Sequence, residues 1–361
     1  MPGGGRPGHS RPGDDRDASR SGVVTLGDVA RHAGVSLATA SRVLNGSTRR
    51  VNEELRTIVL QSAAELGYTP NVHAQAVARG TSSTVGLVVH DIADPYFSAI
   101  AAGVMRVADE RGLIVTLGTT SRDPGREVQY VAMLRAQRAR AVILAGSRVA
   151  DKEQTERLAR EVMAFRRTGG RVACVSQHRL PADTVLPENR AGARELAVRL
   201  AELGHRRFGV LAGSRALVTA RDRLAGFRAG LAEMGIELAP EAVVEGAFTR
   251  DGGYEAAQVL LSRRLDITCL FAVNDVMAVG AMAACRDAGV AVPDELSIAG
   301  FDDIATLRDL VPSLTTVRLP LEEMGVRAGQ LALELDPPER DRLVRVRGEV
   351  VIRESTRPLT R

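Results

Sequence analysis

Residues 25–45 read TLGDVARHAGVSLATASRVLN and carry the start and stop signals of two short helices. Thr25 is a favourable N-cap, and Asp28 three residues later completes the spacing of a capping box. Gly34 tolerates a positive φ and can end the first helix, and Ser36 can cap the second. An apolar stripe at helical spacing supports the first helix: Leu26, Val29, Ala30 and Ala33. Two short helices joined by a turn that contains glycine predict a helix-turn-helix unit.

The second of these helices divides into two faces by helical angle. Ser36, Ala40, Val43 and Leu44 should face the first helix, whereas Leu37, Ala38, Ser41, Arg42 and Asn45 should face away from it. Arg42 can bond a guanine edge or a phosphate, Leu37 and Ala38 can contact thymine methyl groups, and the hydroxyl groups can bond phosphates. A three-helix bundle without a DNA role fits the same spacing. We predict a DNA-reading surface formed by Thr25, Ser36, Leu37, Ala38, Thr39, Ser41, Arg42 and Asn45.

The flanks of this unit show where the domain begins and ends. Residues 1–23 are rich in Gly, Pro, Arg, Asp and Ser, so we expect a disordered tail. Asn52 can cap a third helix that Gly67 ends, which predicts a DNA-binding domain over residues 24–70. Residues 71–83 form a linker of small residues. The N-terminal end carries more arginines than acidic residues, which fits contact with a polyanion and a solvated basic tail equally well.

The chain changes character from residue 85 onward, where short β-branched runs alternate with helical stretches, as in parallel α/β units. The expected strands are 85–90, 113–117, 141–145 and 171–175 in a first set, and 208–212, 242–244, 269–273 and 297–299 in a second. The expected helices lie at 97–111, 126–138, 192–203, 221–234, 254–262 and 276–288. These sets predict an α/β fold of two doubly wound parallel-sheet subdomains. Ligands bind such folds in the crevice at the carboxyl ends of the strands.

Polar side chains follow several of the expected strands and are candidates to line that crevice. Asp91 follows the first strand and is equally a ligand contact or a loop residue, whereas Asp94 is better placed as a helix cap. Asn274 and Asp275 follow a later strand, so one can cap the next helix while the other faces the crevice. Asp302 likewise lies in the loop that follows the strand expected at 297–299. Carboxylate and amide groups accept from or bridge sugar hydroxyls, so this set suits a polyol.

Composition excludes several classes of protein. The three cysteines have no close spacing, which argues against a disulfide framework or a metal knuckle, and we expect neither metal nor cofactor. The six histidines are scattered, and no P-loop, nucleophile elbow or His-Glu-x-x-His motif occurs, so an enzyme is not expected. No apolar run approaches the roughly 20 residues that span a bilayer, and no apolar leader is present, so we expect a cytoplasmic protein.

Several stretches carry a resemblance to a known family. They are VTLGDVARHAGVS at 24–36, ASRVLN at 40–45, ELGYTPN at 65–71, DPYF at 94–97, LGHRR at 203–207, RLAGF at 223–227, ND at 274–275, GFDD at 300–303 and PSLTTV at 312–317. In this order they resemble the lactose-repressor/galactose-repressor (LacI–GalR) family of transcription regulators, over roughly residues 24–357. The resemblance implies two periplasmic-binding-protein-like subdomains preceded by a small all-α helix-turn-helix domain.

The same resemblance implies how the protein would meet DNA. It implies a homodimer, or a tetramer of dimers, on a pseudopalindromic double-stranded operator. It also implies a hinge helix that folds on DNA and inserts an apolar side chain into the minor groove. The stretch AQAVAR at 74–79 fits that place, with Val77 where the family usually has Leu. Val77 is smaller than Leu and a poorer helix former, so a linker residue without DNA contact is the alternative.

The resemblance also implies an effector site. Arg223 matches the family arginine that meets the hydroxyls or carboxylate of the effector, and Phe248 matches a stacking aromatic, although it could equally be a core residue. The expected effector set is Asp91, Phe97, Arg223, Phe248, Asn274 and Asp302. We expect residues 84–184 and 317–334 to form one subdomain, and 185–316 and 335–357 the other. Three places depart from the family pattern, so the effector is not specified: Ser176-Gln177, Glu188 and Leu319.

These features together predict a sequence-specific DNA-binding regulator, a repressor, whose operator affinity is controlled by a small molecule such as a sugar. The effector would favour one relative orientation of the two subdomains and thereby change the spacing of the paired hinge segments. The sequence does not distinguish an inducer from a co-repressor. The alternative is a solute-binding protein with the same two-lobed fold and no DNA role.

Overall fold

The structure is a computed structural model that describes residues 24–45, 51–69, 82–177, 179–335 and 340–359. The chain divides into two compact units, residues 1–75 and 76–361. The expected disordered tail at 1–23 and the hinge residue Val77 lie outside the described residues. Within the described ranges, no helix is long and apolar enough to cross a membrane.

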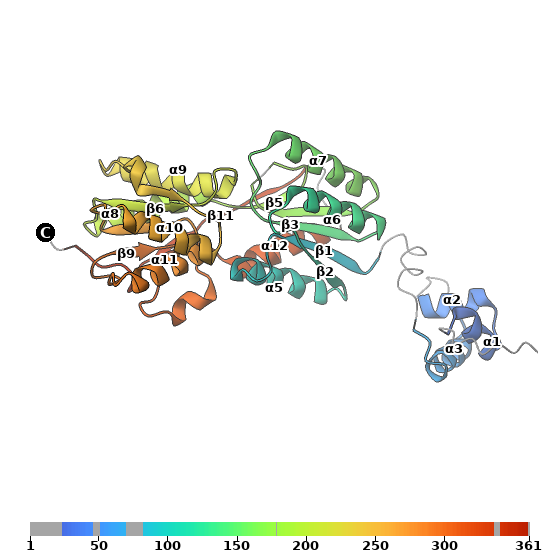
Figure 1. Cartoon of the computed structure of the whole chain (residues 1–361). Helices are drawn as coiled ribbons and strands as arrows, with labels where there is room; N and C mark the ends of the chain where they lie inside the picture. The colour runs from blue at the N-terminus through green and yellow to red at the C-terminus, as the bar shows by residue number, and fades with distance from the viewer. Residues whose placement is uncertain (1–23, 46–50, 70–81, 178, 336–339, 360–361) are drawn as a thin grey trace, which may run out of the picture. The chain divides into compact units, whose positions relative to one another are not determined.

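The described part of the first unit contains three helices, α1 (Leu26–His32), α2 (Leu37–Asn45) and α3 (Glu53–Glu65), as predicted (Figure 1). Their ends carry the expected signals. The reciprocal bonds of the capping box join Thr25 and Asp28, the φ of Gly34 is 64°, and the Asn52 side chain accepts from the amide of Glu54. A small apolar core ties the helices together: Val29, Ala30, Ala40, Val59 and Ala63.

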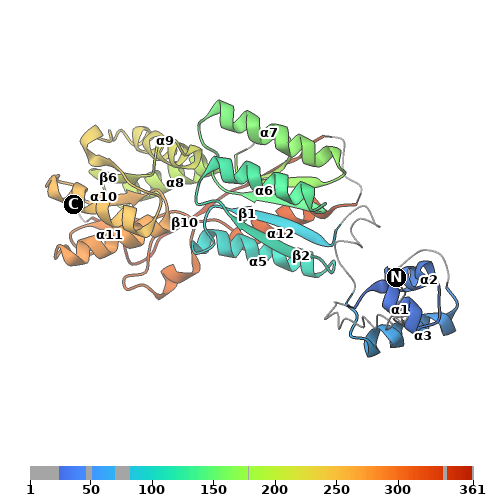
Figure 2. The ribbon, with the colours of Figure 1, turned by 45° about the vertical axis from the view of Figure 1, so that its right-hand side comes forward.

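The N-terminal subdomain of the second unit is built on a six-stranded parallel sheet in the order β11-β5-β4-β3-β1-β2. Its strands are β1 (Thr84–Val89), β2 (Ile114–Thr119), β3 (Ala141–Ala145), β4 (Arg171–Val175), β5 (Asp183–Pro187) and β11 (Leu343–Val346). Helices α5 (Pro95–Asp109) and α12 (Leu321–Leu333) pack together on one face, and α6 (Pro124–Ala136) and α7 (Lys152–Arg167) cover the other (Figure 2). β1 and β3 are almost entirely buried because both faces of the sheet are covered.

The C-terminal subdomain repeats this plan around a four-stranded parallel sheet in the order β7-β6-β8-β9. Its strands are β6 (Phe208–Ala212), β7 (Val243–Glu245), β8 (Cys269–Ala272) and β9 (Ser297–Ala299). Helices α8 (Asn189–Glu202) and α9 (Val218–Glu233) form one packed pair, and α10 (Arg250–Ser262) and α11 (Asp275–Asp287) form another. Two short 3-10 helices also occur, η1 (Pro240–Ala242) and η2 (Ala305–Asp309). The α/β fold with two doubly wound sheets is therefore confirmed.

The chain passes between the two subdomains after β5, before α12 and after β11. The crossing strands β10 (Thr316–Arg318) and β12 (Glu349–Val351) pair antiparallel beside the C-terminal subdomain. This arrangement corrects the expected division at two places. β5 belongs wholly to the first sheet, so the boundary lies after residue 187 and not at 184. Residues 335–357 do not all join the C-terminal subdomain, because β11 pairs with β5.

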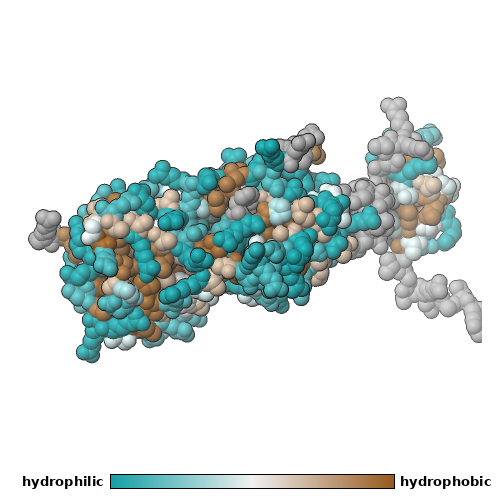
Figure 3. All heavy atoms as spheres, turned by 90° about the horizontal axis from the view of Figure 1, so that it is seen from above, coloured by the Kyte–Doolittle hydropathy of each residue, from teal (hydrophilic) through white to brown (hydrophobic). Residues whose placement is uncertain are grey.

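The expected elements agree with the structure where local patterning is strong. The strands at 141–145, 171–175, 208–212 and 297–299 have the expected bounds. Three helices whose first turn is capped by a side chain, α5, α6 and α10, begin two to four residues earlier than expected. The long helix α7 was not predicted, because half of its residues are charged and only Leu158, Val162 and Phe165 are buried. On the face drawn in Figure 3 the surface is largely hydrophilic, with apolar residues gathered over part of the C-terminal subdomain.

Candidate functional site

The DNA-reading surface predicted on α2 is largely exposed. The Leu37 side chain is 56% exposed, and Ala38 and Arg42 are also exposed, whereas Ala40 on the opposite face is buried. The exposed Leu37, Ala38 and Arg42 side chains leave this face of α2 available to contact another molecule. Ser41 is half-buried, and the Asn45 side chain lies outside the described part.

The hydroxyl groups at the start of α1 and α2 have structural partners. The Ser36 Oγ accepts from the Thr39 amide at 3.1 Å and lies 2.9 Å from the Thr39 hydroxyl. Ser36 is exposed and not turned toward α1 as expected, because its side chain caps α2 instead of packing. The Thr25 hydroxyl donates to Asp28 at 2.6 Å. The roles of Thr25, Ser36 and Thr39 at DNA therefore stay predictions, and each hydroxyl has acceptor or donor capacity beyond its cap.

A pocket with about 40 Å³ of space that a water molecule can reach lies between the two subdomains of the second unit. It brings together five of the six expected effector residues: Phe97, Arg223, Phe248, Asn274 and Asp302. Asp91 does not line this cavity, because its carboxylate accepts from the Ala93 amide at 3.0 Å within its own loop. Asp94 does line it and also caps α5 by accepting from the Tyr96 amide. The carboxyl ends of strands from both sheets therefore converge on one place, as the α/β plan requires.

Arg223 of α9 is the most highly connected side chain in this cavity. Its guanidinium makes a two-pronged pair with the Asp302 carboxylate, at 2.6 and 3.2 Å, and is only 2% exposed. It also donates to the Asn189 side chain and to the Val273 carbonyl, both at 2.8 Å. The ring of Phe301 stacks against it at 3.9 Å. Arg223 is thus held rigidly at the wall of the cavity, not on the surface of its helix.

Asp302 is held in a backbone conformation that side chains rarely adopt. Its φ is +126°, and the φ of the next residue, Asp303, is +58°. Such conformations cost about 1–3 kcal/mol each and persist where surrounding bonds determine them. The amide of Asp302 donates to Val317, and its carbonyl accepts from Leu319. Burial raises the pKa of the Asp302 carboxyl to about 6, although the Arg223 charge acts in the opposite direction.

Asn274 and Asp275 do not share the two tasks as expected, because Asn274 takes both of them. The Asn274 Oδ1 accepts from the Met277 amide at 3.0 Å and caps α11, while the residue lines the cavity. Asp275 points away from the cavity into the core. It accepts from the Thr316 hydroxyl at 2.6 Å and the Ile304 amide at 3.0 Å. Burial, with a smaller contribution from the Asp302 charge, raises the pKa of Asp275 to about 8.

Replacing Asp275 with asparagine should make stability less dependent on pH. Because the pKa of Asp275 is raised on folding, its protonated form favours the folded state. That stabilisation is present below about pH 4 and is lost as the pH rises to about 8. The loss approaches about 1.4 kcal/mol per pH unit within this range. Asp275→Asn keeps the acceptor oxygen without the charge, so we expect a higher free energy of unfolding than wild type at about pH 8.

Urea unfolding across about pH 6.5 to 8 measures this effect, because Asp302 contributes mainly below about pH 6. The matched control is Asp309→Asn, since Asp309 is exposed at the end of η2. A variant whose stability changed with pH as steeply as the wild type would show that Asp275 does not take up the proton.

Residues that sequence reasoning missed also line the cavity, chiefly Arg122. Arg122 follows β2 with a φ of +63° and reaches across to the other subdomain. There it donates to the Phe248 carbonyl at 3.0 Å and lies over the Phe248 ring at 5.7 Å. His90 at the end of β1 packs edge-on against Phe97, and burial lowers its pKa to about 4. Their positions just after strands of the first sheet were the signal that could have identified both.

Direct hydrogen bonds join the subdomains beside the cavity. The Gln177 side chain donates to the Thr219 hydroxyl at 2.7 Å, and the Ser147 hydroxyl accepts from the Thr219 amide at 3.1 Å. The carbonyl of Arg148 accepts from the Val218 amide at 3.0 Å. These contacts fasten the first turn of α9, and Arg223 lies one turn further along. The departure from the family pattern at Ser176-Gln177 therefore falls at a contact between subdomains.

The described residues offer no group of three or more His, Cys, Asp or Glu side chains that could hold a metal ion. All three cysteines are buried and free, and burial raises the pKa of each thiol. The cavity therefore has the chemistry of a binding site with charged, amide and aromatic groups.

Comparison with known proteins agrees with both units. Residues 25–71 match the model of bacterial regulatory proteins, lacI family, and residues 197–356 match a periplasmic binding protein-like domain. The chain is 38% identical over 312 residues to the HTH-type transcriptional regulator GalS of Salmonella typhimurium, covering 86% of this chain and 90% of that protein. It is 34% identical to the regulator DegA of Bacillus subtilis, covering 93% of this chain and 99% of that protein.

Solved structures extend the similarity to the whole fold. The lac repressor dimer bound to operator and the anti-inducer ONPF aligns with a TM-score of 0.76 at 28% identity, covering 92% of this chain and 99% of that one. The complex of the transcriptional regulator CelR with cellobiose aligns with a TM-score of 0.67 at 29% identity, with the same coverage. The proteins named here are all transcription regulators. With its helix-turn-helix, its two α/β subdomains and these relatives, the chain belongs to the lacI family of bacterial regulatory proteins.

Proposed function

We propose that this protein is a repressor that binds a specific operator and that a sugar, bound between the two α/β subdomains, controls its operator affinity. The observation that carries this proposal is the shared cavity. Phe97 comes from one subdomain and Arg223, Phe248, Asn274 and Asp302 come from the other, in a chain that also presents an exposed helix-turn-helix surface. A solute-binding protein would have no use for that surface.

The chemistry of the cavity favours an uncharged polyol. Two arginines, Arg122 and Arg223, are matched by two carboxylates, Asp94 and Asp302, so no net charge is left for an ionic ligand to neutralise. Asn274 uses its oxygen as a cap and keeps its amide hydrogens for a ligand oxygen. The rings of Phe97, Tyr96 and Phe248 supply apolar surface for the face of a sugar ring. The cellobiose complex of the regulator CelR is consistent with this class.

The effector acts by population shift. Arg122 and Gln177 each bond one subdomain to the other, so a ligand that contacts both subdomains favours one relative orientation. The change in operator affinity equals the preference of the ligand between the two orientations. A sugar that contacted only one subdomain would bind without regulating.

A homodimer completes the proposal, because two recognition helices read a pseudopalindromic operator. Edge strand β2 supplies apolar surface for a second copy, since Ile114 is 66% exposed and Leu117 and the neighbouring Met105 of α5 are also exposed. We place the protein in the cytoplasm, where it meets both DNA and imported sugars, and assign it no catalytic role.

Selection of duplexes from a random library by the full-length protein tests the proposal. We expect a two-fold symmetric site and, with one sugar of a panel, a change of at least about tenfold in operator affinity, equivalent to about 1.4 kcal/mol. The same sugar should raise the free energy of unfolding by about 2.7 kcal/mol at 100 times its Kd. Absence of any sequence preference, with and without the sugars, would overturn the regulator assignment.

A further inference from the structure

The cavity between the two subdomains is closed to a sugar in this structure. A water molecule can reach about 40 Å³ of it. One buried water needs about 10–15 Å³ measured in this way, so the cavity admits only about three water molecules. A sugar ring with its hydroxyl groups is several times larger. The site must therefore widen before a sugar binds, and the contacts that join the subdomains decide how it widens.

Hydrogen bonds between described residues join the subdomains at two places, apart from the segments where the chain crosses. At the first place, several bonds hold the start of α9, including those of Val218 and Thr219 described above. At the second place, the Arg122 Nη2 donates to the Phe248 carbonyl at 3.0 Å. Because one bond holds the second place and several hold the first, the contact of Arg122 should open first and leave the start of α9 as the pivot.

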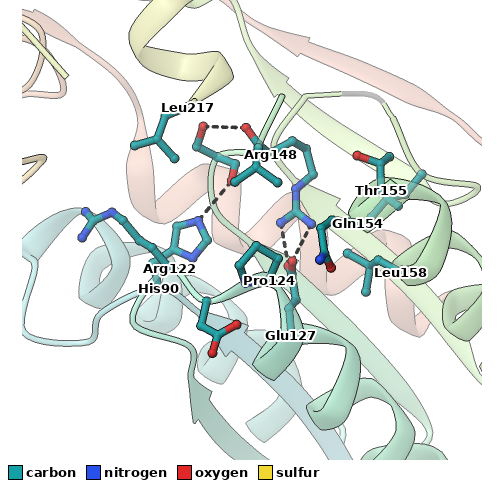
Figure 4. Close-up of a pocket in the computed structure, with 13 residues that line it drawn as sticks. His90, Arg122, Pro124, Glu127, Arg148, Gln154, Thr155, Leu158 and Leu217 are labelled. Atoms are coloured by element: carbon teal, nitrogen blue, oxygen red, sulfur yellow. Dashed lines mark hydrogen bonds and ion pairs between the residues drawn. The ribbon is translucent and has the colours of Figure 1, made fainter. Parts of the chain in front are cut away.

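The backbone at Arg122 is fixed, although its side chain has few partners. Ser121 and Arg122 have φ values of 52° and 63°, and such a turn persists only where surrounding bonds hold it. The Ser121 amide donates to the His90 carbonyl at 2.8 Å, and the Arg122 amide donates to the Thr120 hydroxyl at 3.3 Å. Figure 4 shows the Arg122 guanidinium extending away from His90, at the edge of the residues drawn. The side chain can therefore turn while its backbone stays in place.

The Arg122 guanidinium is only partly satisfied, and it covers a surface that a sugar would use. It has five N–H donors, and its one hydrogen bond to a described residue is the bond to the Phe248 carbonyl. Burial lowers the pKa of this guanidinium, so its place between the subdomains costs hydration, while Asp94 and Asp91 act in the opposite direction. The guanidinium carbon lies over the Phe248 ring, 5.7 Å from its centroid. A sugar can stack on this face of the ring only after Arg122 has moved.

We propose that Arg122 is the gate of the effector site and one of its specificity-determining residues. In the sugar-free protein, the guanidinium closes the cavity by bonding to the Phe248 carbonyl. An entering sugar displaces it from this carbonyl, stacks on the uncovered Phe248 ring and accepts hydrogen bonds from the free donors of Arg122. One hydrogen bond from a charged donor shifts such an equilibrium by about tenfold to a hundredfold, so the gate is mostly closed without a ligand and still opens readily. The inference rests on the proposed function and adds the residue that controls entry and selects hydroxyl groups.

The rate of sugar association tests the gate. The probes are glucose, galactose, ribose, cellobiose and lactose, and the protein is the full-length chain. Arg122→Asn retains a residue that tolerates positive φ, but its side chain is too short to reach Phe248. We expect a sugar that binds the wild type to associate at least about fivefold faster with this variant, because the open form is no longer a minor fraction. Stopped-flow tyrosine fluorescence measures the rate, since Tyr96 lines the cavity and the chain has no tryptophan.

The loss of single hydroxyl groups tests the contact. Arg122→Met keeps a long side chain and removes the donors. For deoxy forms of the sugar that binds, we expect one missing hydroxyl to lower wild-type affinity at least about tenfold, and to change the affinity of Arg122→Met less than about twofold. A residue that only supported the fold would not cancel the effect of one particular hydroxyl. Isothermal titration calorimetry measures both affinities, and Arg126→Met is the matched control, because Arg126 is an exposed arginine of α6 that does not line the cavity.

The outcomes separate this inference from the proposed function. If the sugar associates with Arg122→Asn no faster than with the wild type, Arg122 is not a gate. If every missing hydroxyl costs the same factor in Arg122→Met as in the wild type, Arg122 does not bind the sugar. The proposed function stands in both cases, because the wild type still binds the sugar and responds to it. If none of the probes binds the wild type or alters its operator affinity, both the proposed function and this inference fail.

Discussion

Replacing Arg223 with alanine should lower the free energy of unfolding by about 3–5 kcal/mol, because it leaves the Asp302 carboxylate buried without its partner. The same change removes the donors to Asn189 and to the Val273 carbonyl. Few single substitutions cost this much, and those that do commonly uncover a buried charge. Urea unfolding of the purified variant at neutral pH measures the loss.

Arg228→Ala on the same helix is the matched control, since Arg228 is exposed and the change should cost less than about 0.5 kcal/mol. A double variant, Arg223→Met with Asp302→Asn, should recover much of the stability, because no buried charge is then left unpaired. Both Arg223 variants should lose the response of operator binding to sugar. A loss of less than about 1 kcal/mol in Arg223→Ala would show that Asp302 is not ionised beside it.

Arg42→Ala should weaken operator binding by about 1–3 kcal/mol and relax the preference for one base pair, if the exposed Arg42 side chain reads a base edge. The guanidinium offers two parallel donors to a guanine, and lysine does not reproduce this geometry. Arg42→Lys should therefore lose most of the base preference while it retains some affinity. Titration of the operator and of single-base variants, at fixed salt, separates the two effects.

Arg157→Ala serves as the control for a change of net charge, because Arg157 lies exposed on α7 of the second unit. If Arg42→Ala lost the same affinity on every duplex, and if the slope of log affinity against log salt concentration became shallower by about one, Arg42 would be assigned to a phosphate instead. Unchanged affinity for all duplexes would remove Arg42 from the DNA-reading surface.

The helix-turn-helix and most of the α/β elements could be predicted because their signals are local. The capping box at Thr25 and Asp28 and the positive φ of Gly34 act over a few residues. A buried strand such as 141–145 shows in the chain as an unbroken apolar run. By contrast, half of the residues of α7 are charged, and β5 and β11 are short strands without a strong pattern. Each of these elements forms only because the first sheet and its neighbours are there to pack or pair with it.

The effector cavity was predicted in part, and the reason lies in sequence separation. The position of a polar residue after a strand identified Asn274 and Asp302, and family resemblance supplied Arg223 and Phe248. Neither the position after a strand nor the family resemblance shows that Arg223 bonds to Asn189 and Asp302, which are 34 and 79 residues away. Neither shows that the Asp91 side chain bonds within its own loop. Arg122 and Gln177 act across the two subdomains and became visible only when both were in place.

By itself, the sequence determined most of the helices and strands, and that the chain carries a DNA-binding unit and two ligand-binding subdomains. Caps, apolar periodicity and β-branched runs are short-range effects that folding elsewhere does not alter. Only the tertiary structure decided that β11 returns to the first sheet and that Arg223 and Asp302 are paired. These features arise from contacts between residues far apart in the chain, where burial and charge pairing depend on the complete fold.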